Sequence, residues 1–294
     1  MVAKRLAHLA NRALEHVVAD EHAMANLINA ALAPVISRAE VTLANGLKLQ
    51  YRRQGPESGP ALILLHGYSD SSQSFGRIMP LLPSEQRVIA VDLRGHGDSD
   101  KPADGYRMSD LADDVIGLMD RLAVPSAVVV GHSMGSFVAQ AMVERDPRRV
   151  SALVLLSSAP RAVNDVVTEL QLAVESLTDP IDTEFVRGFQ FATVAQPVPE
   201  AFLDAAIVNS RRMPASVWKK ALAGLMAYQP ASPRSSVRTL VLGGSRDAVF
   251  SVGEQKALAR EYPFAQLRLI ENLGHALHWE QPEVFVRELM RFAK

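Results

Sequence analysis

The chain has 294 residues, with 31 Lys plus Arg against 32 Asp plus Glu, and it contains no cysteine. A formal charge of −1 gives none of the basic field that holds DNA or RNA, so we expect no nucleic-acid partner. The lack of cysteine excludes disulfides, thiolate nucleophiles and cysteine-ligated zinc or iron–sulfur sites. No run approaches the roughly 18 apolar residues of a membrane span. We therefore expect a soluble, cytoplasmic protein.

The N-terminal segment is predicted to be helical. Apolar residues recur at helical spacing from Val2 to Val17 and again from Met24 to Leu32, before Pro34. Polar and charged residues between Asn11 and His16 interrupt the apolar core that a signal peptide needs, so we expect the segment to be retained. It would pack on the rest of the chain, form a homo-oligomer contact or dock on a membrane surface, and its acidic residues argue against the last.

From Val41 the pattern changes to strands that alternate with helices. Alternation around Asn45-Gly46, a hairpin signal, predicts an antiparallel pair at the start of a sheet. The short apolar runs that suit buried parallel strands are Ala61–Leu65, Val88–Val91, Ala127–Val130, Ala152–Leu156, Leu240–Leu242 and Leu267–Ile270. The segments with helical periodicity are Met108–Leu122, Met134–Arg145, Val252–Glu261 and Glu283–Phe292. This order predicts an α/β fold with a doubly wound, mostly parallel sheet.

One segment departs from the alternation of strands and helices. Between Ala159 and about Pro233 the sequence shows helical patterning punctuated by prolines and no convincing strand. Because it interrupts the sheet between two strands, it is predicted to cover their carboxyl ends as a lid. We therefore divide the chain into an N-terminal helical extension, a catalytic domain in two parts and an inserted helical cap. The boundaries are 1–40 for the extension, 41–160 and 233–294 for the catalytic domain, and 161–232 for the cap.

The strongest local signal is the run from Gly131 to Gly135, in which an apolar strand enters Gly-His-Ser-Met-Gly and then a helix. This is the pattern of a nucleophile elbow, where small residues on both sides of a serine let strand and helix approach closely. The pattern predicts that Ser133 is a nucleophile exposed at a helix N-terminus. We interpret His132, inside the elbow, as a packing residue.

A serine nucleophile needs a base and a carboxylate that orients the base. Asp247 follows one predicted strand directly, and His275 follows the next one through a glycine loop. Since the ends of parallel strands converge on one edge of a sheet, we predict a triad of Ser133, Asp247 and His275. His278 is the rival base, and we assign it a supporting polar role. Neither Asp165 nor Glu271 lies as directly behind a strand as Asp247 does.

Acyl chemistry also needs donors for an oxyanion. The backbone N–H of Met134 can supply one donor, and the loop after Ala61–Leu65 can supply the other through the backbone N–H of Tyr68. The Tyr68 ring is then free to line a pocket. The segment Asp92–Ser99 is rich in titratable groups, but its spacing matches no common metal signature, so we interpret it as a structural loop. We expect no metal and no cofactor.

The aromatic residues of the predicted lid offer apolar surface for a substrate, although about half of them should form the lid's own core. The aromatic and methionine residues that the predicted lid offers are Phe185, Phe189, Phe191, Phe202, Met213, Trp218, Met226 and Tyr228, and the sequence does not say which of them form the core. The candidate substrate-binding residues are Tyr68, Phe189, Phe191, Trp218 and His278.

From about residue 41 onward the sequence resembles the α/β-hydrolase superfamily, in its lidded branch of bacterial esterases, lactonases and haloperoxidase-like enzymes. The blocks that carry the resemblance are Leu64–Tyr68, Asp92–Ser99, Gly131–Gly135, Gly243–Asp247 and Gly274–Glu280. Haloalkane dehalogenases and epoxide hydrolases place aspartate where Ser133 stands, so the resemblance does not extend to those activities. Carbon–carbon bond hydrolases usually carry Gly-Pro-Gly after their His-Gly and tryptophan after the base, and this chain carries Tyr68-Ser69-Asp70 and Ala276 there.

The predicted function is that of a serine hydrolase that cleaves carboxylic esters of small to medium, largely apolar substrates through an acyl-enzyme on Ser133. A lactonase or a perhydrolase could use the same triad. An alternative of another class is a small-molecule receptor in which the triad is vestigial or very slow. The expected partner is a small ester or lactone, with possible homo-oligomer contacts through the N-terminal helices.

Overall fold

The computed structural model describes residues 35–231 and 234–293. The helical prediction for residues 1–34, with the oligomer and membrane-surface roles suggested for it, lies outside the described residues. The final residues of the predicted extension are not helical, because strand β1 begins at Ser37, four residues before Val41. Its sequence Ser-Arg-Ala-Glu-Val-Thr alternates half-buried with exposed positions, which is the pattern of an edge strand.

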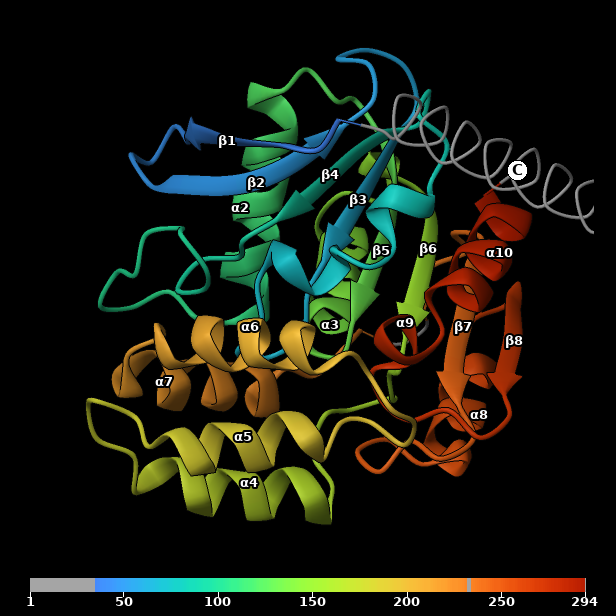
Figure 1. Ribbon diagram of the computed structural model, residues 1–294. Coiled ribbons are helices and arrows are strands. Elements are labelled where there is room, and N and C mark those ends of the chain that lie inside the picture. Colours follow the sequence, from blue (N-terminus) through green and yellow to red (C-terminus); the bar gives the residue numbers. More distant parts are fainter. Residues whose placement is uncertain (1–34, 232–233, 294) are drawn as a thin grey trace, which may run out of the picture. The chain divides into compact units, whose positions relative to one another are not determined.

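The described chain is built on one sheet of eight strands in the order β1-β2-β4-β3-β5-β6-β7-β8 (Figure 1). β1 and β2 pair antiparallel, β2 and β4 also pair antiparallel, and all other neighbours are parallel. The strands are β1 (Ser37–Thr42), β2 (Lys48–Gln54), β3 (Ala61–Leu65), β4 (Arg87–Val91), β5 (Ala127–His132), β6 (Val150–Leu156), β7 (Thr239–Gly244) and β8 (Ala265–Ile270). The predicted α/β fold with a mostly parallel sheet is confirmed.

The hairpin between β1 and β2 is present, but its turn is longer than two residues. The amide of Gly46 donates to the Leu43 carbonyl at 3.0 Å, and the amide of Leu43 donates to the Leu47 carbonyl at 2.8 Å. Gly46 has φ +86°, a left-handed conformation that glycine adopts without a steric cost. The turn is therefore a three-residue loop closed by a glycine bulge, in which Asn45-Gly46 occupies the second half.

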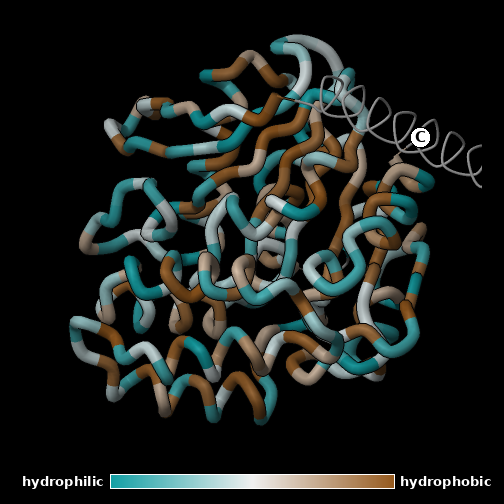
Figure 2. Tube along the Cα trace, viewed as in Figure 1, coloured by the Kyte–Doolittle hydropathy of each residue, from teal (hydrophilic) through white to brown (hydrophobic). Residues whose placement is uncertain are grey.

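Both faces of the sheet are covered, which explains why the central strands are apolar throughout. On one face, Ile63, Leu65 and Val129 pack with helices α2 (Met108–Arg121), α3 (Met134–Arg145) and α8 (Val252–Glu261). On the other face, Leu62, Leu64 and Val130 pack with two short 3₁₀ helices, η1 (Ser72–Phe75) and η2 (Met79–Leu81), and with the α-helices α9 (Leu277–Glu280) and α10 (Pro282–Ala293). Figure 2 shows the hydrophobic residues gathered on the central strands. Short η3 (Pro147–Arg149) leads from α3 into β6.

Four helices, called the cap below, lie between β6 and β7 in the chain: α4 (Asp165–Glu175), α5 (Thr183–Phe191), α6 (Glu200–Arg211) and α7 (Ala215–Ala227). α4 packs on α7, and α5 packs on α6. Figure 1 shows them beyond the carboxyl ends of the central parallel strands. Among the described helices, none is both long and apolar enough to cross a membrane.

Candidate active site

Ser133 lies at the junction of a strand and a helix in a conformation that few residues adopt. It follows β5 directly, has φ +49° and ψ −119°, and precedes the first residue of α3. A Cβ atom on Gly131 would lie 2.2 Å from the Gly135 carbonyl oxygen, and one on Gly135 would lie 2.3 Å from the Leu65 carbonyl oxygen. Only glycine fits at these two positions, and their small size brings β3, β5 and α3 together around the serine.

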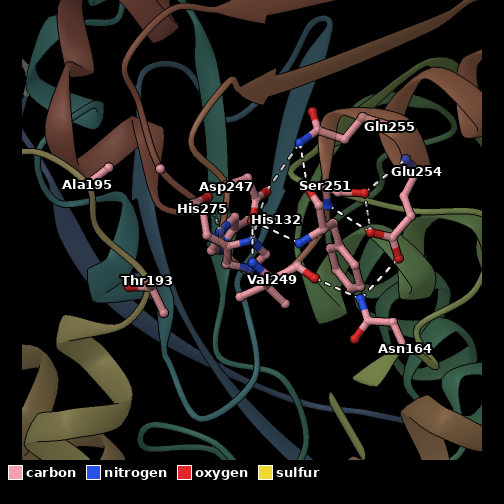
Figure 3. Close-up of polar contacts among 12 residues, drawn as sticks. His132, Asn164, Thr193, Ala195, Asp247, Val249, Ser251, Glu254, Gln255 and His275 are labelled. Atoms are coloured by element: carbon pink, nitrogen blue, oxygen red, sulfur yellow. Dashed lines mark hydrogen bonds and ion pairs between the residues drawn. The ribbon is translucent and has the colours of Figure 1, made fainter. Parts of the chain in front are cut away.

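His275 and Asp247 come together at the carboxyl ends of β8 and β7. The Nδ1 atom of His275 lies 3.0 Å from each carboxylate oxygen of Asp247 (Figure 3). The amides of Val249 and Phe250 donate to Oδ1 of Asp247 at 2.8 and 2.9 Å, which fixes the carboxylate. The side chains of His275 and Asp247 are 4% and 0% exposed. With Nδ1–H donated to the carboxylate, Nε2 of His275 is left as the acceptor that a general base needs.

The backbone around His275 is held by hydrogen bonds on two sides. The amide of Gly274 donates to Oε1 of Glu280 at 2.9 Å. Nε2–H of His132 donates to the His275 carbonyl at 3.1 Å, so His132 supports the loop from inside the elbow. Burial lowers the pKa of His132 well below its usual value, and it therefore acts as a neutral donor.

The cap also contacts this loop. The amide of Ala276 donates to the Thr193 carbonyl at 2.9 Å, and the amide of Ala195 donates to Oε1 of Glu280 at 3.3 Å. Thr193 and Ala195 lie just after α5, and Figure 3 shows them beside the loop that carries His275. The segment after α5 is thus fixed to the same backbone as the candidate base.

The turn of residues 67–70, called the 67–70 turn below, follows β3 and contains the predicted oxyanion donor Tyr68. The amide of Asp70 donates to the Gly67 carbonyl at 3.2 Å, and Ser69 has φ +64°. His66 braces the turn, because its Nδ1–H donates to the Gly67 carbonyl at 2.8 Å and its Nε2 accepts from the Leu93 amide at 3.0 Å.

The two predicted oxyanion donors are backbone amides without partners in the described chain. Neither the Tyr68 N–H nor the Met134 N–H donates a hydrogen bond to another group within residues 35–231 and 234–293. Met134 is the first residue of α3, so its N–H is one of the N-terminal amides that a helix leaves unpaired. Both amides are therefore available to a ligand oxygen.

Ser133 and His275 open onto one cavity of about 440 Å³. Its wall is almost wholly apolar and comes from the 67–70 turn, from α4, α5 and α7 of the cap, and from the loop after Asp247. The lining residues are Tyr68, Ser133, Val166, Val167, Leu170, Glu184, Phe185, Gly188, Phe189, Ala192, Thr193, Leu222, Leu225, Val249, Phe250 and His275. A cavity of this size and lining suits an apolar small molecule.

The family model described as "alpha/beta hydrolase fold" matches residues 60–282. The chain belongs to this family. Among solved structures, this alpha/beta hydrolase is 27% identical to the esterase RhEst1 from Rhodococcus sp. ECU1013, covering 87% of this chain and 98% of that one with a TM-score of 0.76. It is 30% identical to Est816, an N-acyl homoserine lactone degrading enzyme, covering 86% and 100% of the chains with a TM-score of 0.74. It is also 28% identical over 272 residues to a non-heme chloroperoxidase of Streptomyces lividans, covering 86% of this chain and 99% of the relative.

The five candidate substrate-binding residues of this alpha/beta hydrolase do not all reach the cavity. Tyr68 and Phe189 line it, whereas Phe191, Trp218 and His278 do not. Phe191 is 47% exposed at the end of α5. Sequence patterning cannot assign a side chain to the cavity when several aromatic residues lie on one short helix.

Trp218 and His278 are instead fully buried side chains that pack against other residues and do not line the cavity. The Trp218 ring meets the rings of Tyr68 and Phe189 edge-on at 5.1 and 5.5 Å between centroids, so it packs behind two residues that line the cavity. His278 places its Nε2 atom 3.2 Å from Oγ of Ser74, away from the cavity. Burial lowers the pKa of His278 to about 3, which agrees with a neutral packing role.

Several cavity residues were missed from the sequence. The largest groups are Val166, Val167 and Leu170 on α4, and Val249 and Phe250 just after Asp247. The α4 residues recur at helical spacing, which signals an apolar face but not what that face meets. The position of Val249 and Phe250 beside a candidate catalytic residue was the better signal.

Asp70 is a buried carboxyl that the predicted triad does not include. Burial raises its pKa to about 7, although a hydrogen bond from the Gln190 amide at 3.1 Å favours the ionised form. The segment Asp92–Ser99 forms a loop, as predicted, in which Asp92 accepts hydrogen bonds from the amides of Ser72 and Asp98. Within the described ranges no group of three or more His, Cys, Asp or Glu side chains could hold a metal ion.

Proposed function

We propose that this alpha/beta hydrolase cleaves carboxylic esters of small to medium, largely apolar substrates through an acyl-enzyme on Ser133. The observation that carries the proposal is that Ser133 and His275 line the same apolar cavity, with Nδ1 of His275 held by Asp247 at 3.0 Å. The esterase and lactonase relatives support hydrolysis of an acyl–oxygen bond.

In the proposed acylation step, Oγ of Ser133 attacks the ester carbonyl carbon while Nε2 of His275 takes the hydroxyl proton. The carbonyl oxygen becomes an oxyanion that accepts hydrogen bonds from the amides of Tyr68 and Met134. The tetrahedral intermediate then collapses. The carbon–oxygen bond to the alcohol breaks, and the alcohol leaves with the proton from His275.

Deacylation reverses these roles with water. His275 takes a proton from water as the water oxygen attacks the acyl carbon, and the same two amides bind the second oxyanion. The bond to Ser133 breaks, the acid leaves, and the proton on His275 returns to Oγ. Asp247 stays ionised throughout and stabilises the imidazolium that forms in both steps.

The apolar wall of the cavity supports an uncharged acyl or aryl group as the part of the substrate bound there. Leu222, Leu225 and Phe250 are at least nine-tenths buried, so a ligand group that contacts them leaves water almost completely. A lactone of similar polarity is the second candidate, because the N-acyl homoserine lactone degrading relative spans 86% of this chain.

The test is stopped-flow hydrolysis of p-nitrophenyl butyrate by the wild-type protein and by Ser133→Ala. We expect a burst of nitrophenol equal to the enzyme concentration from the wild type and none from the variant, whose rate should fall by at least about a thousandfold. Equal turnover by the two proteins would exclude Ser133 as the nucleophile. Stabilisation of the wild type by an ester without product would favour the receptor alternative.

A further inference from the structure

Three consecutive side chains of the 67–70 turn each hydrogen-bond a different helix of the cap. The hydroxyl of Tyr68 donates to the Trp218 carbonyl on α7 at 2.7 Å. The hydroxyl of Ser69 donates to Oγ of Ser210 on α6 at 3.3 Å. Asp70 accepts from Nε2 of Gln190 on α5 at 3.1 Å.

These contacts form one connected network. Nε2 of Gln190 donates to Oγ of Ser210 at 2.8 Å as well as to Asp70. Nε1 of Trp218 donates to the Ser210 carbonyl at 3.3 Å. Gln190, Ser210 and Trp218, called the clasp below, therefore join α5, α6 and α7 to each other as well as to the turn.

All members of the network are buried. Gln190 is 1% exposed, Ser210 and Trp218 are 0% exposed, and Asp70 is 7% exposed. A buried hydrogen bond cannot be replaced by one to water, so breaking it leaves a donor or acceptor unsatisfied. The cap and the 67–70 turn are thus expected to move together or not at all.

We propose that the clasp positions the Tyr68 amide for the oxyanion, so that the cap sets the rate of the chemical step as well as the shape of the cavity. The inference rests on the proposed function. Ser69 supplies the physical reason, because its φ of +64° is a conformation that a non-glycine residue holds only under constraint. The clasp supplies that constraint through the side chains of Ser69 and its two neighbours. Gln190 is accordingly a positioning residue, which acts through the turn and does not touch the substrate.

The test compares Gln190→Met with a matched Gln196→Met. Methionine keeps the length of the side chain and removes both donors of Gln190. Gln196, in the segment between α5 and α6, also joins the cap region to the rest of the chain, since its Nε2 donates to the Asn272 carbonyl at 3.0 Å. Within the described residues its side chain makes no hydrogen bond to the clasp or to the 67–70 turn. We expect Gln190→Met to lower kcat about tenfold or more with KM changed less than about threefold, and Gln196→Met to change neither appreciably.

Inhibition by an alkyl trifluoromethyl ketone gives a readout that a purely structural role would not move. Ser133 would add to its carbonyl and create an oxyanion, so the inhibition constant should rise in Gln190→Met by the same factor by which kcat/KM falls. Ser210→Ala, a smaller change to the same network, should shift both quantities in the same direction. Melting temperatures are measured for all variants, and kcat, KM and the inhibition constant are compared only between variants that are folded at the assay temperature.

Unchanged kcat in both folded clasp variants, or a rise in KM at constant kcat, would overturn the proposal, since the clasp would then only shape the cavity. Wild type and Ser133→Ala are assayed in parallel. If the wild type shows no hydrolysis that depends on Ser133, the proposed function and the clasp proposal both fail. If Ser133-dependent hydrolysis is present and the clasp variants equal the wild type, only the clasp proposal fails.

Discussion

At the scale of single residues, the candidate site depends on geometry that few substitutions can preserve. Ser133 holds φ +49° because glycines at 131 and 135 leave room for the backbone around it. Asp247 is held just as closely, with Oδ1 accepting from two amides as well as from His275. The carboxylate can therefore be altered chemically while its neighbours keep their positions.

Asp247→Asn tests the role of the carboxylate. The asparagine oxygen can still accept from the amides of Val249 and Phe250, but the amide group would favour the wrong tautomer of His275 and would not stabilise its cation. We expect kcat for a p-nitrophenyl ester to fall by about a thousandfold or more with little change in melting temperature. Glu271→Gln is the control, because Glu271 is an exposed carboxylate at the same sheet edge, bonded to Ser245. Comparable losses in both variants would remove Asp247 from its proposed role.

Among the helices, α5 contacts the 67–70 turn with one side chain and lines the cavity with others. Gln190 faces the 67–70 turn, whereas Glu184, Gly188 and Ala192 line the cavity at intervals of one helical turn. A Cβ atom built on Gly188 meets no other atom within 4 Å, and the residue has no positive φ. The missing side chain therefore leaves usable space in the cavity wall rather than meeting a backbone requirement.

Gly188→Leu should shorten the acyl group that the cavity accepts. Leucine favours a helix more than glycine does, so the fold should be kept. We expect kcat/KM for p-nitrophenyl octanoate to fall about tenfold or more while that for the acetate changes less than about threefold, since each buried methylene contributes about 0.8 kcal/mol. Ala201→Leu, at an exposed position on α6 outside the lining, should leave the ratio of the two rates unchanged. An unchanged ratio in Gly188→Leu would show that α5 does not limit chain length.

The sequence could predict those features of the structure that depend on local patterns, but not the contacts between distant segments. The order of strands and helices and the positions of Ser133, Asp247 and His275 at strand ends followed from local patterns, because strand periodicity and glycine spacing are local. The clasp did not, since Gln190 and Ser210 meet Asp70 through the packing of α5 and α6, which no local pattern encodes. The same limit explains why Trp218 and His278 were predicted to bind substrate although they pack behind residues nearer the cavity.

At the scale of the whole molecule, buried titratable groups link stability to pH. Burial lowers the pKa of His66 to about 4 and those of His96 and His278 to about 3, and it raises the pKa of Asp70 to about 7. Between pH 6.5 and 4 the unfolded chain binds protons on these histidines that the folded chain does not bind. The free energy of unfolding therefore decreases as the pH is lowered through this range. Asp70 acts in the opposite sense, because only its folded form is protonated in most of this window.

His132, whose pKa burial also lowers well below its usual value, belongs with these groups. Four histidines against one aspartate leave a net uptake of about three protons on unfolding, so the histidines decide the sign. We expect the free energy of unfolding, measured with urea, to fall by roughly 4 kcal/mol for each unit by which the pH is lowered below pH 6. His278→Gln should reduce this slope by about 1.4 kcal/mol per pH unit, whatever its effect at neutral pH. A free energy that is constant from pH 7 to 5 would contradict the assignment of these histidines as neutral buried groups.

Mass spectrometry of the protein after reaction with a fluorophosphonate tests whether Ser133 is the nucleophile of an acyl-transfer site. We expect one adduct per chain, located on the peptide that carries Ser133 and absent from Ser133→Ala. Prior incubation with an ester substrate should slow its formation. An adduct on another residue, or an unmodified Ser133 in protein that hydrolyses esters, would show that Ser133 is not the nucleophile.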